Sequence, residues 1–223
     1  MEHYDRLAML SELVRERIAG NIEVKQKLLA DLTFHSLIID VAMQMVKSLR
    51  AQGKVFFFGN GGSAADAQHL AAEFTGRYLK ERGGLPGLAL NANTSSLTAI
   101  ANDYGFERVF ARQLEALGQP GDVAVGITTS GNSGNVIQAL KVAKSKSIFS
   151  VAMTGNSGGI ARTLADRTIC VPSWDTPRIQ ECHILVGHII CEIVEQVLCR
   201  DREHKRRITA VQPAFAVPSE SAS

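Results

Sequence analysis

The chain has 223 residues, of which 45% are hydrophobic and 21% charged, and its formal net charge is +2. This is the composition of an ordinary globular protein, so it excludes a disordered chain and gives no support to a nucleic-acid partner, which would require a strongly basic surface. Four cysteines are too few for a disulfide scaffold. We find no signal-peptide pattern and no 18-residue apolar run, so we expect a reduced, cytoplasmic protein with no membrane partner.

The first fifty residues predict two helices. Apolar residues recur every three or four positions over residues 4–19 and again over 22–52. Gly20-Asn21 is expected to separate the two helices, and Gly53 to end the second.

The rest of the chain alternates between strand and helix patterns. Short apolar runs predict five strands, and because these runs lack polar alternation, both faces of the sheet should be covered. The pattern predicts an α/β fold, a three-layer doubly wound sheet of about five parallel strands flanked by helices. The expected strands are residues 55–59, 87–91, 123–128, 149–155 and 167–172, and the expected helices 63–78, 94–117, 132–146, 158–165 and about 178–198.

We expect one domain over residues 1–199. Within it, residues 1–52 would be oligomerisation helices and residues 53–199 the α/β sandwich. Residues 200–223 would form a charged, flexible tail, whose last stretch looks frayed. Its charged run RDREHKRR could be a basic nucleic-acid patch, but Asp201 and Glu203 interrupt it, so we favour a solvated helix end.

The first candidate ligand site is the glycine-rich turn GNGGSA at residues 59–64. In open parallel sheets, ligands bind where strands end, and a helix N-terminus attracts anions. The string also matches the dinucleotide fingerprint G-x-G-x-x-G/A, but the second strand ends in LNAN, without the acidic residue that would hold a ribose. A tight turn would not need Asn60 and Ser63 as well, so we expect a ligand other than a dinucleotide.

The second candidate site is the segment TTSGNSGN at residues 128–135. A single N-cap requires only one such residue, whereas this segment holds several hydroxyl and amide groups and no charge. Hydroxyls and free backbone amides at a helix start suit a phosphate group, which we favour over plain capping.

Two helices carry candidate metal ligands. His69 and Glu73 are four residues apart and share a helix face, where such a pair is usually a surface ion pair but can bind a divalent metal. Gln180, His183 and His188 are polar residues within the apolar last helix, and the periodicity does not decide which histidine faces inward.

Taken together, these motifs resemble the sugar isomerase (SIS) domain, and more closely the bacterial phosphoheptose isomerases. The resemblance spans residues 1–198 and rests on several motifs in the right order. They are GNGGSAADAQHLAAEFTGR, TAIANDYGFE, TTSGNSGN and TPRIQECHILVGH.

The resemblance implies an enzyme that converts sedoheptulose 7-phosphate to D-glycero-D-manno-heptose 7-phosphate, the first step toward nucleotide-activated heptose for lipopolysaccharide or other surface glycans. It implies one Zn²⁺ per subunit and makes Glu73 and His188 the acid–base pair, with His188 rather than His183 in the site. The implied metal ligands are His69, Glu73, Gln180 and His188. The implied substrate-binding residues are Asn60, Gly61, Gly62, Ser63, Asn102, Asp103, Thr129, Ser130, Ser133 and Gln180.

An enediol mechanism suits these residue types. Ketose–aldose isomerisation needs a base at carbon, an acid near oxygen and stabilisation of the developing oxyanion. The sequence leaves open which of Glu73 and His188 takes the carbon-bound proton.

Two further SIS classes compete with the enzyme. A non-catalytic SIS protein that binds the bacterial replication initiator keeps both loops but lacks the catalytic glutamate and the last-helix histidine, both of which this chain has. A sugar-phosphate-sensing regulator would need an added DNA-binding region, which we do not find. SIS relatives are usually homotetramers, and the apolar stripes of the leading helices suit an intersubunit bundle with active sites at subunit contacts.

Overall fold

Five parallel strands form the central sheet, in the order β2-β1-β3-β4-β5. A computed structural model of the chain describes residues 2–211, with side chains described for residues 6–200. The strands are β1 (Val55–Gly59), β2 (Gly87–Ala89), β3 (Val123–Ile127), β4 (Phe149–Thr154) and β5 (Arg167–Cys170). The helices are α1 (Glu2–Ala30), α2 (Leu32–Arg50), α3 (Gly62–Thr75), α4 (Thr94–Tyr104), α5 (Val109–Leu117), α6 (Gly134–Ser145), α7 (Ala161–Leu164) and α8 (Thr176–Val211), with one 3₁₀ turn, η1 (Phe106–Arg108).

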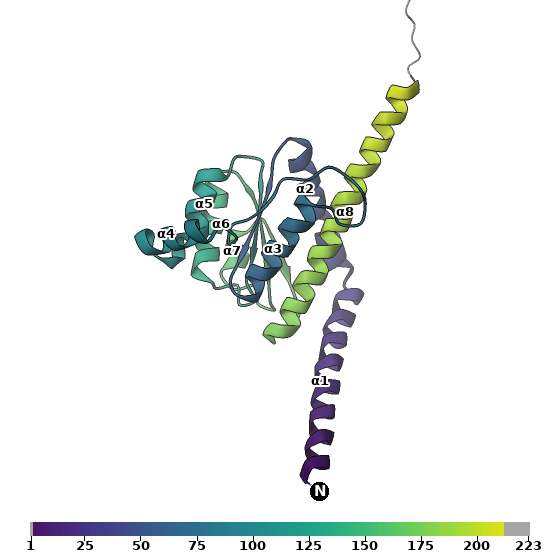
Figure 1. Cartoon of the computed structure of the whole chain (residues 1–223), viewed down its shortest axis with the longest axis vertical. Coiled ribbons are helices and arrows are strands. Elements are labelled where there is room, and N and C mark those ends of the chain that lie inside the picture. Colours follow the sequence, from purple (N-terminus) through teal and green to yellow (C-terminus); the bar gives the residue numbers. More distant parts are fainter. Residues whose placement is uncertain (1, 212–223) are drawn as a thin grey trace, which may run out of the picture.

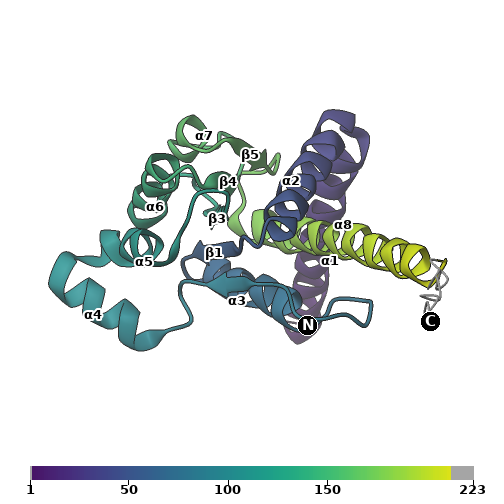
Figure 2. The ribbon, with the colours of Figure 1, turned by 90° about the horizontal axis from the view of Figure 1, so that it is seen from above.

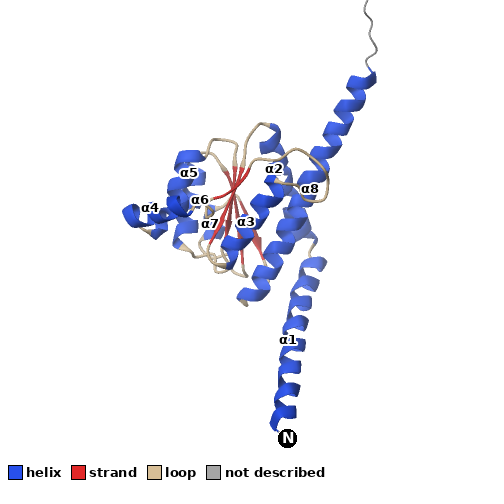
Figure 3. Ribbon diagram, in the orientation of Figure 1, coloured by secondary structure: helices blue, strands red, loops and turns tan. Residues whose placement is uncertain are grey.

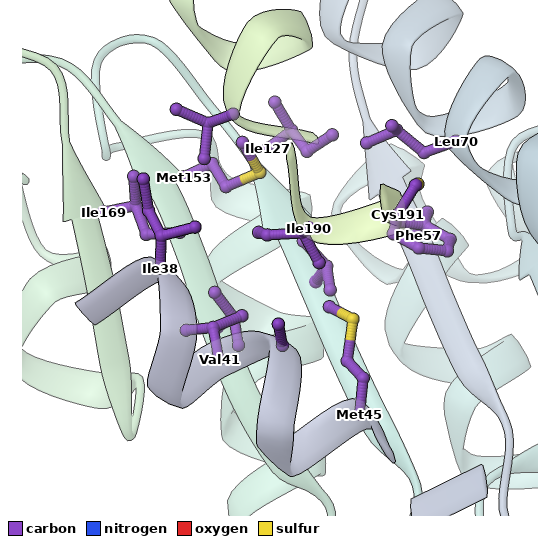
Figure 4. Packing of buried hydrophobic residues seen from close by; sticks show 14 of the residues in the cluster. Ile38, Val41, Met45, Phe57, Leu70, Ile127, Met153, Ile169, Ile190 and Cys191 are labelled. Atoms are coloured by element: carbon purple, nitrogen blue, oxygen red, sulfur yellow. The ribbon is translucent and has the colours of Figure 1, made fainter. Parts of the chain in front are cut away.

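Helices cover both faces of the sheet, which confirms the predicted three-layer fold (Figures 2 and 3). Successive strand residues point to opposite faces. In β1, Phe57 therefore packs beneath α2, α3 and α8, whereas Phe56 and Phe58 pack against α5 and α6. Figure 4 shows the first of these two cores, in which Met45 of α2 and Ile190 of α8 lie over the strands.

The two leading helices meet at a different residue from the one predicted. The expected break at Gly20-Asn21 is wrong, because α1 continues to Ala30 and its axis turns by 80° into α2. Asp31 begins α2 by accepting hydrogen bonds from the backbone N–H groups of Thr33 and Phe34, at 2.9 and 3.0 Å. The Thr33 hydroxyl and then the Phe34 amide hold the pKa of Asp31 below its ordinary value. Gly20 instead lies within the helix, beside the side chain of Arg178.

The predicted helix over residues 94–117 is divided into α4, η1 and α5. Gly105 lies at the division with φ of +85°, a conformation that side chains with a Cβ rarely adopt. The division turns α4 away from the sheet, as Figure 1 shows. None of the α4 residues is fully buried.

The last helix is longer than predicted. The expected end near residue 198 is wrong, because α8 continues to Val211, and the charged run is helical, as its interpretation as a helix end predicted. Residues 212–223, the end of the expected tail, lie outside the described part. By length and composition, Thr176–Arg200 could cross a membrane, but half of its most apolar window is buried, as in a helix that belongs to a protein core.

Candidate active site

Three candidate ligands meet between α3 and α8. His69 and Glu73 lie one turn apart on α3, with 3.4 Å between His69 Nε2 and Glu73 Oε1. From α8, His188 brings its Nε2 to 2.8 Å from His69 Nε2, a distance at which one ring donates a hydrogen bond to the other. The ligand atoms of all three residues lie within 4.8 Å of one another. Residues 115 or more positions apart in the chain thus form one cluster.

The chemistry of this cluster suits a metal ion. Two imidazole nitrogens and one carboxylate oxygen are the donors that Zn²⁺ takes at catalytic sites, where a fourth position stays open for water or substrate. None of the three residues is fully buried, so a small molecule can reach them. His69, Glu73 and His188 could therefore hold a metal ion.

Gln180 lies at the glycine-rich turn. A Cβ atom added to Gly62 would overlap the Gln180 side-chain amide, so the absence of a side chain at residue 62 lets α8 approach the start of α3. Gln180 and His188 are eight residues apart on α8, about 12 Å along the helix. The structure therefore places Gln180 beside the turn that was predicted to bind substrate.

The glycine-rich turn is held in place by paired side-chain amides. Asn60 and Asn135 exchange two hydrogen bonds of 2.8 Å, which tie this turn to the start of α6. Gly61 has φ of +55°, a value that favours glycine. No atom lies within 4 Å of the position that a Cβ would take, so the backbone of Gly61 is open to a ligand. Ser63 is buried beneath the turn, and its side chain lies against Gly59.

A polar cavity of about 250 Å³ lies beside the loop that follows β3. Thr129 and Ser130 line it, as do Ser157 and Ser173 from other loops, and no charged residue does. The hydroxyl of Ser133 lies 2.9 Å from that of Thr128. The cavity also meets the first turn of α8, so hydroxyl groups and a helix N-terminus converge where the sequence predicts phosphate binding.

Asn102 and Asp103 lie apart from the other predicted site residues. Both are on α4, whose main contacts are with α5 and η1. The Asn102 side-chain amide donates to the Asp103 carboxylate at 2.8 Å, and no contact with the α3–α8 cluster is found among the described side chains. Within one subunit, these two residues do not join the site.

A larger cavity, of about 720 Å³, lies between β2, α4 and α5. Its polar lining includes Asn93, Arg112 and Gln113. None of the predicted site residues lines it, so volume alone does not identify the site.

The family model described as SIS domain matches residues 23–155. The phosphoheptose isomerase of Aneurinibacillus thermoaerophilus is 49% identical over 193 residues, which cover 86% of this chain and 98% of that protein. The phosphoheptose isomerase of Aquifex aeolicus is 57% identical over 73% of this chain and 85% of its own. The solved phosphoheptose isomerase of Neisseria gonorrhoeae is 44% identical and superimposes with a TM-score of 0.79, covering 84% of this chain and 99% of that one.

This chain belongs to the phosphoheptose isomerase family of SIS-domain proteins. The resemblance found in its motifs is thereby confirmed. The replication-initiator alternative gains no support, since these relatives carry the name of an enzyme and Glu73 and His188 meet in one cluster.

The structure also separates the two histidines of α8. His183 is fully buried and lies 3.1 Å from the Thr154 carbonyl through its Nε2. Burial lowers its pKa from 6.5 to about 4, although the Thr154 hydrogen bond opposes the shift. His183 is therefore a neutral core residue, and its Nε2–H donates a hydrogen bond to the Thr154 carbonyl.

We expect His183 to make the fold sensitive to acid. Unfolded His183 takes up a proton near pH 6.5 and folded His183 only near pH 4, so falling pH favours the unfolded chain between these values. Between pH 7 and pH 5, this costs the wild type about 2 kcal/mol, which a His183→Gln variant should not lose. Urea unfolding of both proteins, at one protein concentration, measures the difference. Equal pH dependence in the two proteins would show that His183 titrates normally.

Several residues of this region were not predicted from the sequence. Asp66 lies one turn before His69 on α3, and its Oδ2 is buried with no partner among the described atoms. Burial raises the pKa of Asp66 to about 6, against the opposing effect of His69. The feature of the sequence that could have indicated Asp66 is its position three residues before His69.

A buried ion pair also lies next to the cluster. Arg82, from the loop after α3, donates from Nε to Glu195 Oε1 of α8 at 2.9 Å, and both side chains are at most 4% exposed. Glu195 also accepts hydrogen bonds from the backbone amides of Tyr78, Leu79 and Lys80. Burial opposes ionisation of Glu195, but these amides and Arg82 outweigh it and hold the pKa below its ordinary value. The feature of the sequence that could have indicated this pair is the charged residue Glu195 in the apolar stripe of α8.

Proposed function

We propose that this protein isomerises sedoheptulose 7-phosphate to D-glycero-D-manno-heptose 7-phosphate. The observation that carries the proposal is the meeting of His69, Glu73 and His188 on two helices, of which α3 begins at the glycine-rich turn and α8 begins at the polar cavity. The relatives at 49% and 57% identity are both named phosphoheptose isomerase.

The arrangement along α8 suits a long sugar phosphate. Ile179 lines the polar cavity, Gln180 lies at the glycine-rich turn and His188 lies in the cluster. His188 is nine residues beyond Ile179, about 14 Å along the helix. In sedoheptulose 7-phosphate, the reacting carbons C1 and C2 lie at the opposite end from the phosphate. Binding of the phosphate near Thr129 and Ser130 would therefore direct the reacting end toward Glu73 and His188.

Glu73 and His188 are the proposed acid–base pair. One group removes a proton from carbon, the other exchanges a proton with the neighbouring oxygen, and an enediol lies between the two steps. Gln180 and the backbone amides of the glycine-rich turn would orient the sugar hydroxyls. We propose that Asn102 and Asp103 bind the same hydroxyls in the assembled protein, where the active site lies at a contact between subunits. Phosphate recognition would rely on hydroxyls and backbone amides, because no charged side chain lines the polar cavity.

We propose Zn²⁺ as the metal, one ion per subunit, held by His69, Glu73 and His188, with Gln180 as the fourth ligand. Bound there, it would polarise the carbonyl and hydroxyl groups of the sugar. The donor set supports zinc, whereas the Gln180 ligand rests on the family resemblance alone. We also propose a cytoplasmic location, in keeping with a phosphorylated metabolite as substrate, and no nucleic-acid or membrane partner.

The test is incubation of the purified protein with sedoheptulose 7-phosphate, with detection of the aldose product. Metal content is measured on the same sample, and a chelated sample is assayed before and after zinc is restored. We expect turnover that falls on chelation and returns with zinc. An inert wild type that captures a replication initiator would support the regulator instead, and an active, metal-free protein would remove zinc from the mechanism.

We further propose a homotetramer that α1 helps to assemble. Residues Leu10, Val14 and Ile18 recur along one face of α1, and each is at least 44% exposed in the single subunit. An apolar helix face of this kind is usually covered by another chain. Light scattering at micromolar concentration should report four subunits, and Val14→Glu combined with Ile18→Glu should give a smaller species. A wild-type monomer would refute the assembly.

A further inference from the structure

The loop of residues 76–86 connects α3 to β2 and extends alongside α8 (Figure 2). Its position is fixed at both helices by one arginine. Arg82 pairs with Glu195 of α8, and its Nη2 donates to the Glu73 carbonyl at 2.7 Å, while Nη1 donates to the Phe74 carbonyl at 2.9 Å. The last carbonyls of a helix lack partners within the helix, and an arginine here supplies them. The loop is thereby held against the end of the helix that carries Glu73.

This loop also carries an aromatic ring to the cluster. Tyr78 donates its backbone amide to Glu195 at 3.0 Å, and its ring lies against the imidazole of His188, with 5.6 Å between ring centroids and 32° between planes. The distance is within the range of attractive ring contacts. The His188 ring meets a second ring, that of His69, at 5.0 Å between centroids.

His188 lacks the usual means of orientation for a metal ligand. A histidine ligand generally donates its second ring N–H to a carboxylate or a carbonyl, which fixes the ring and its tautomer. Among the described residues, Nε2 of His188 meets His69, but its Nδ1 makes no hydrogen bond to protein. A contact with another ring can limit rotation of the imidazole in place of that bond.

We propose that Tyr78 is a positioning residue for His188: held by the buried Arg82–Glu195 pair, its ring fixes the orientation in which His188 Nε2 faces His69 and Glu73. Tyr78 acts through His188, and it does so by its ring and not by its hydroxyl. The inference rests on the proposed metal site and is independent of which sugar the protein converts.

Three variants test the role of the ring. Tyr78→Leu fills a similar space without a ring, Tyr78→Phe keeps the ring without the hydroxyl, and Leu79→Ala alters the neighbouring side chain, which is 62% exposed. Zinc affinity is measured by competition with a chromogenic chelator, and kcat and KM with sedoheptulose 7-phosphate. We expect Tyr78→Leu to bind zinc about tenfold more weakly and to lose a similar factor in kcat, with KM and the melting temperature unchanged. Tyr78→Phe and Leu79→Ala should stay within twofold of the wild type.

Other results would overturn the proposal. If Tyr78→Leu keeps the zinc affinity and kcat of the wild type, the ring does not position His188, and if Tyr78→Phe loses as much as Tyr78→Leu, the hydroxyl is the active group. A loss of the same size in Leu79→Ala would point to the loop as a whole. A crystal structure of metal-free Tyr78→Leu gives a readout that needs neither metal nor turnover: we expect a rotated His188 ring, and an unchanged ring would refute the proposal. Failure of the wild type on the heptose substrate would overturn the proposed function and leave the zinc and crystallographic results decisive.

Discussion

Replacing Glu73 with glutamine is expected to lower kcat about a thousandfold, within the range that loss of a general acid or base commonly costs. The carboxylate of Glu73 lies 3.4 Å from His69 Nε2, in the cluster that His188 completes. An amide of the same shape can neither take a proton from carbon nor offer a charged oxygen to a metal ion. The Glu73→Gln protein should therefore fold and bind a phosphate group while turnover is lost.

The measurement compares kcat and KM for sedoheptulose 7-phosphate with the affinity of the metal-free proteins for inorganic phosphate, which then probes the polar cavity. Glu81→Gln is the matched control, because its side chain is 90% exposed and, among the described side chains, pairs with Arg77 at the surface. We expect phosphate affinity to be equal in wild type and both variants. A Glu73→Gln protein that keeps a tenth of the wild-type kcat would show that the carboxylate does not carry the proton transfer. Zinc affinity, measured in parallel, separates loss of the base from loss of a metal ligand.

Replacing Glu195 with glutamine is expected to destabilise the fold by about 3–5 kcal/mol. Glu195 is 1% exposed and Arg82 is 4% exposed at its side chain, so the arginine would be left as a buried charge with no counter-ion. Three backbone amides that now donate to the carboxylate would also have to share a weaker acceptor. Removing one member of a buried pair is costly because the partner's charge cannot regain its hydration.

Urea unfolding at fixed protein concentration measures this loss. Glu192→Gln is the control, since Glu192 lies one turn earlier on the same helix, is only partly buried and bonds to Gln196 at 2.9 Å. We expect that change to cost less than about 0.5 kcal/mol. A loss below about 1 kcal/mol for Glu195→Gln would mean that water reaches Arg82 in the variant.

Much of the fold was predictable because its signals are local. The VFFFG run at residues 55–59 becomes β1 with every residue buried, and the glycine-rich turn that follows begins α3 as expected. The error in the leading helices lies where a local signal was not decisive. Glycine often ends a helix, yet α1 continues through Gly20, which lies beside the side chain of Arg178, and α2 begins at the N-cap Asp31 after the bend.

Candidate ligands were predictable only in part. The i, i+4 spacing places His69 and Glu73 on one face of α3, but the same spacing describes a surface ion pair. The residues alone did not choose between His183 and His188, and the family resemblance favoured His188. Packing explains the difference, because α8 turns His183 toward Thr154 in the core and His188 toward His69.

The sequence by itself determined the parallel α/β architecture, the two glycine- and hydroxyl-rich turns and, through its motifs, the family. These features depend on periodicity and on turn residues, which act over a few neighbouring positions. Only the tertiary structure decided which side chains meet across more than a hundred residues: His188 with His69, Arg82 with Glu195 and Tyr78 with His188. Such contacts depend on how α3, its following loop and α8 pack together, and no local pattern records that packing. For the same reason Asn102 and Asp103, which the resemblance placed in the site, lie apart from it on α4 in the single subunit.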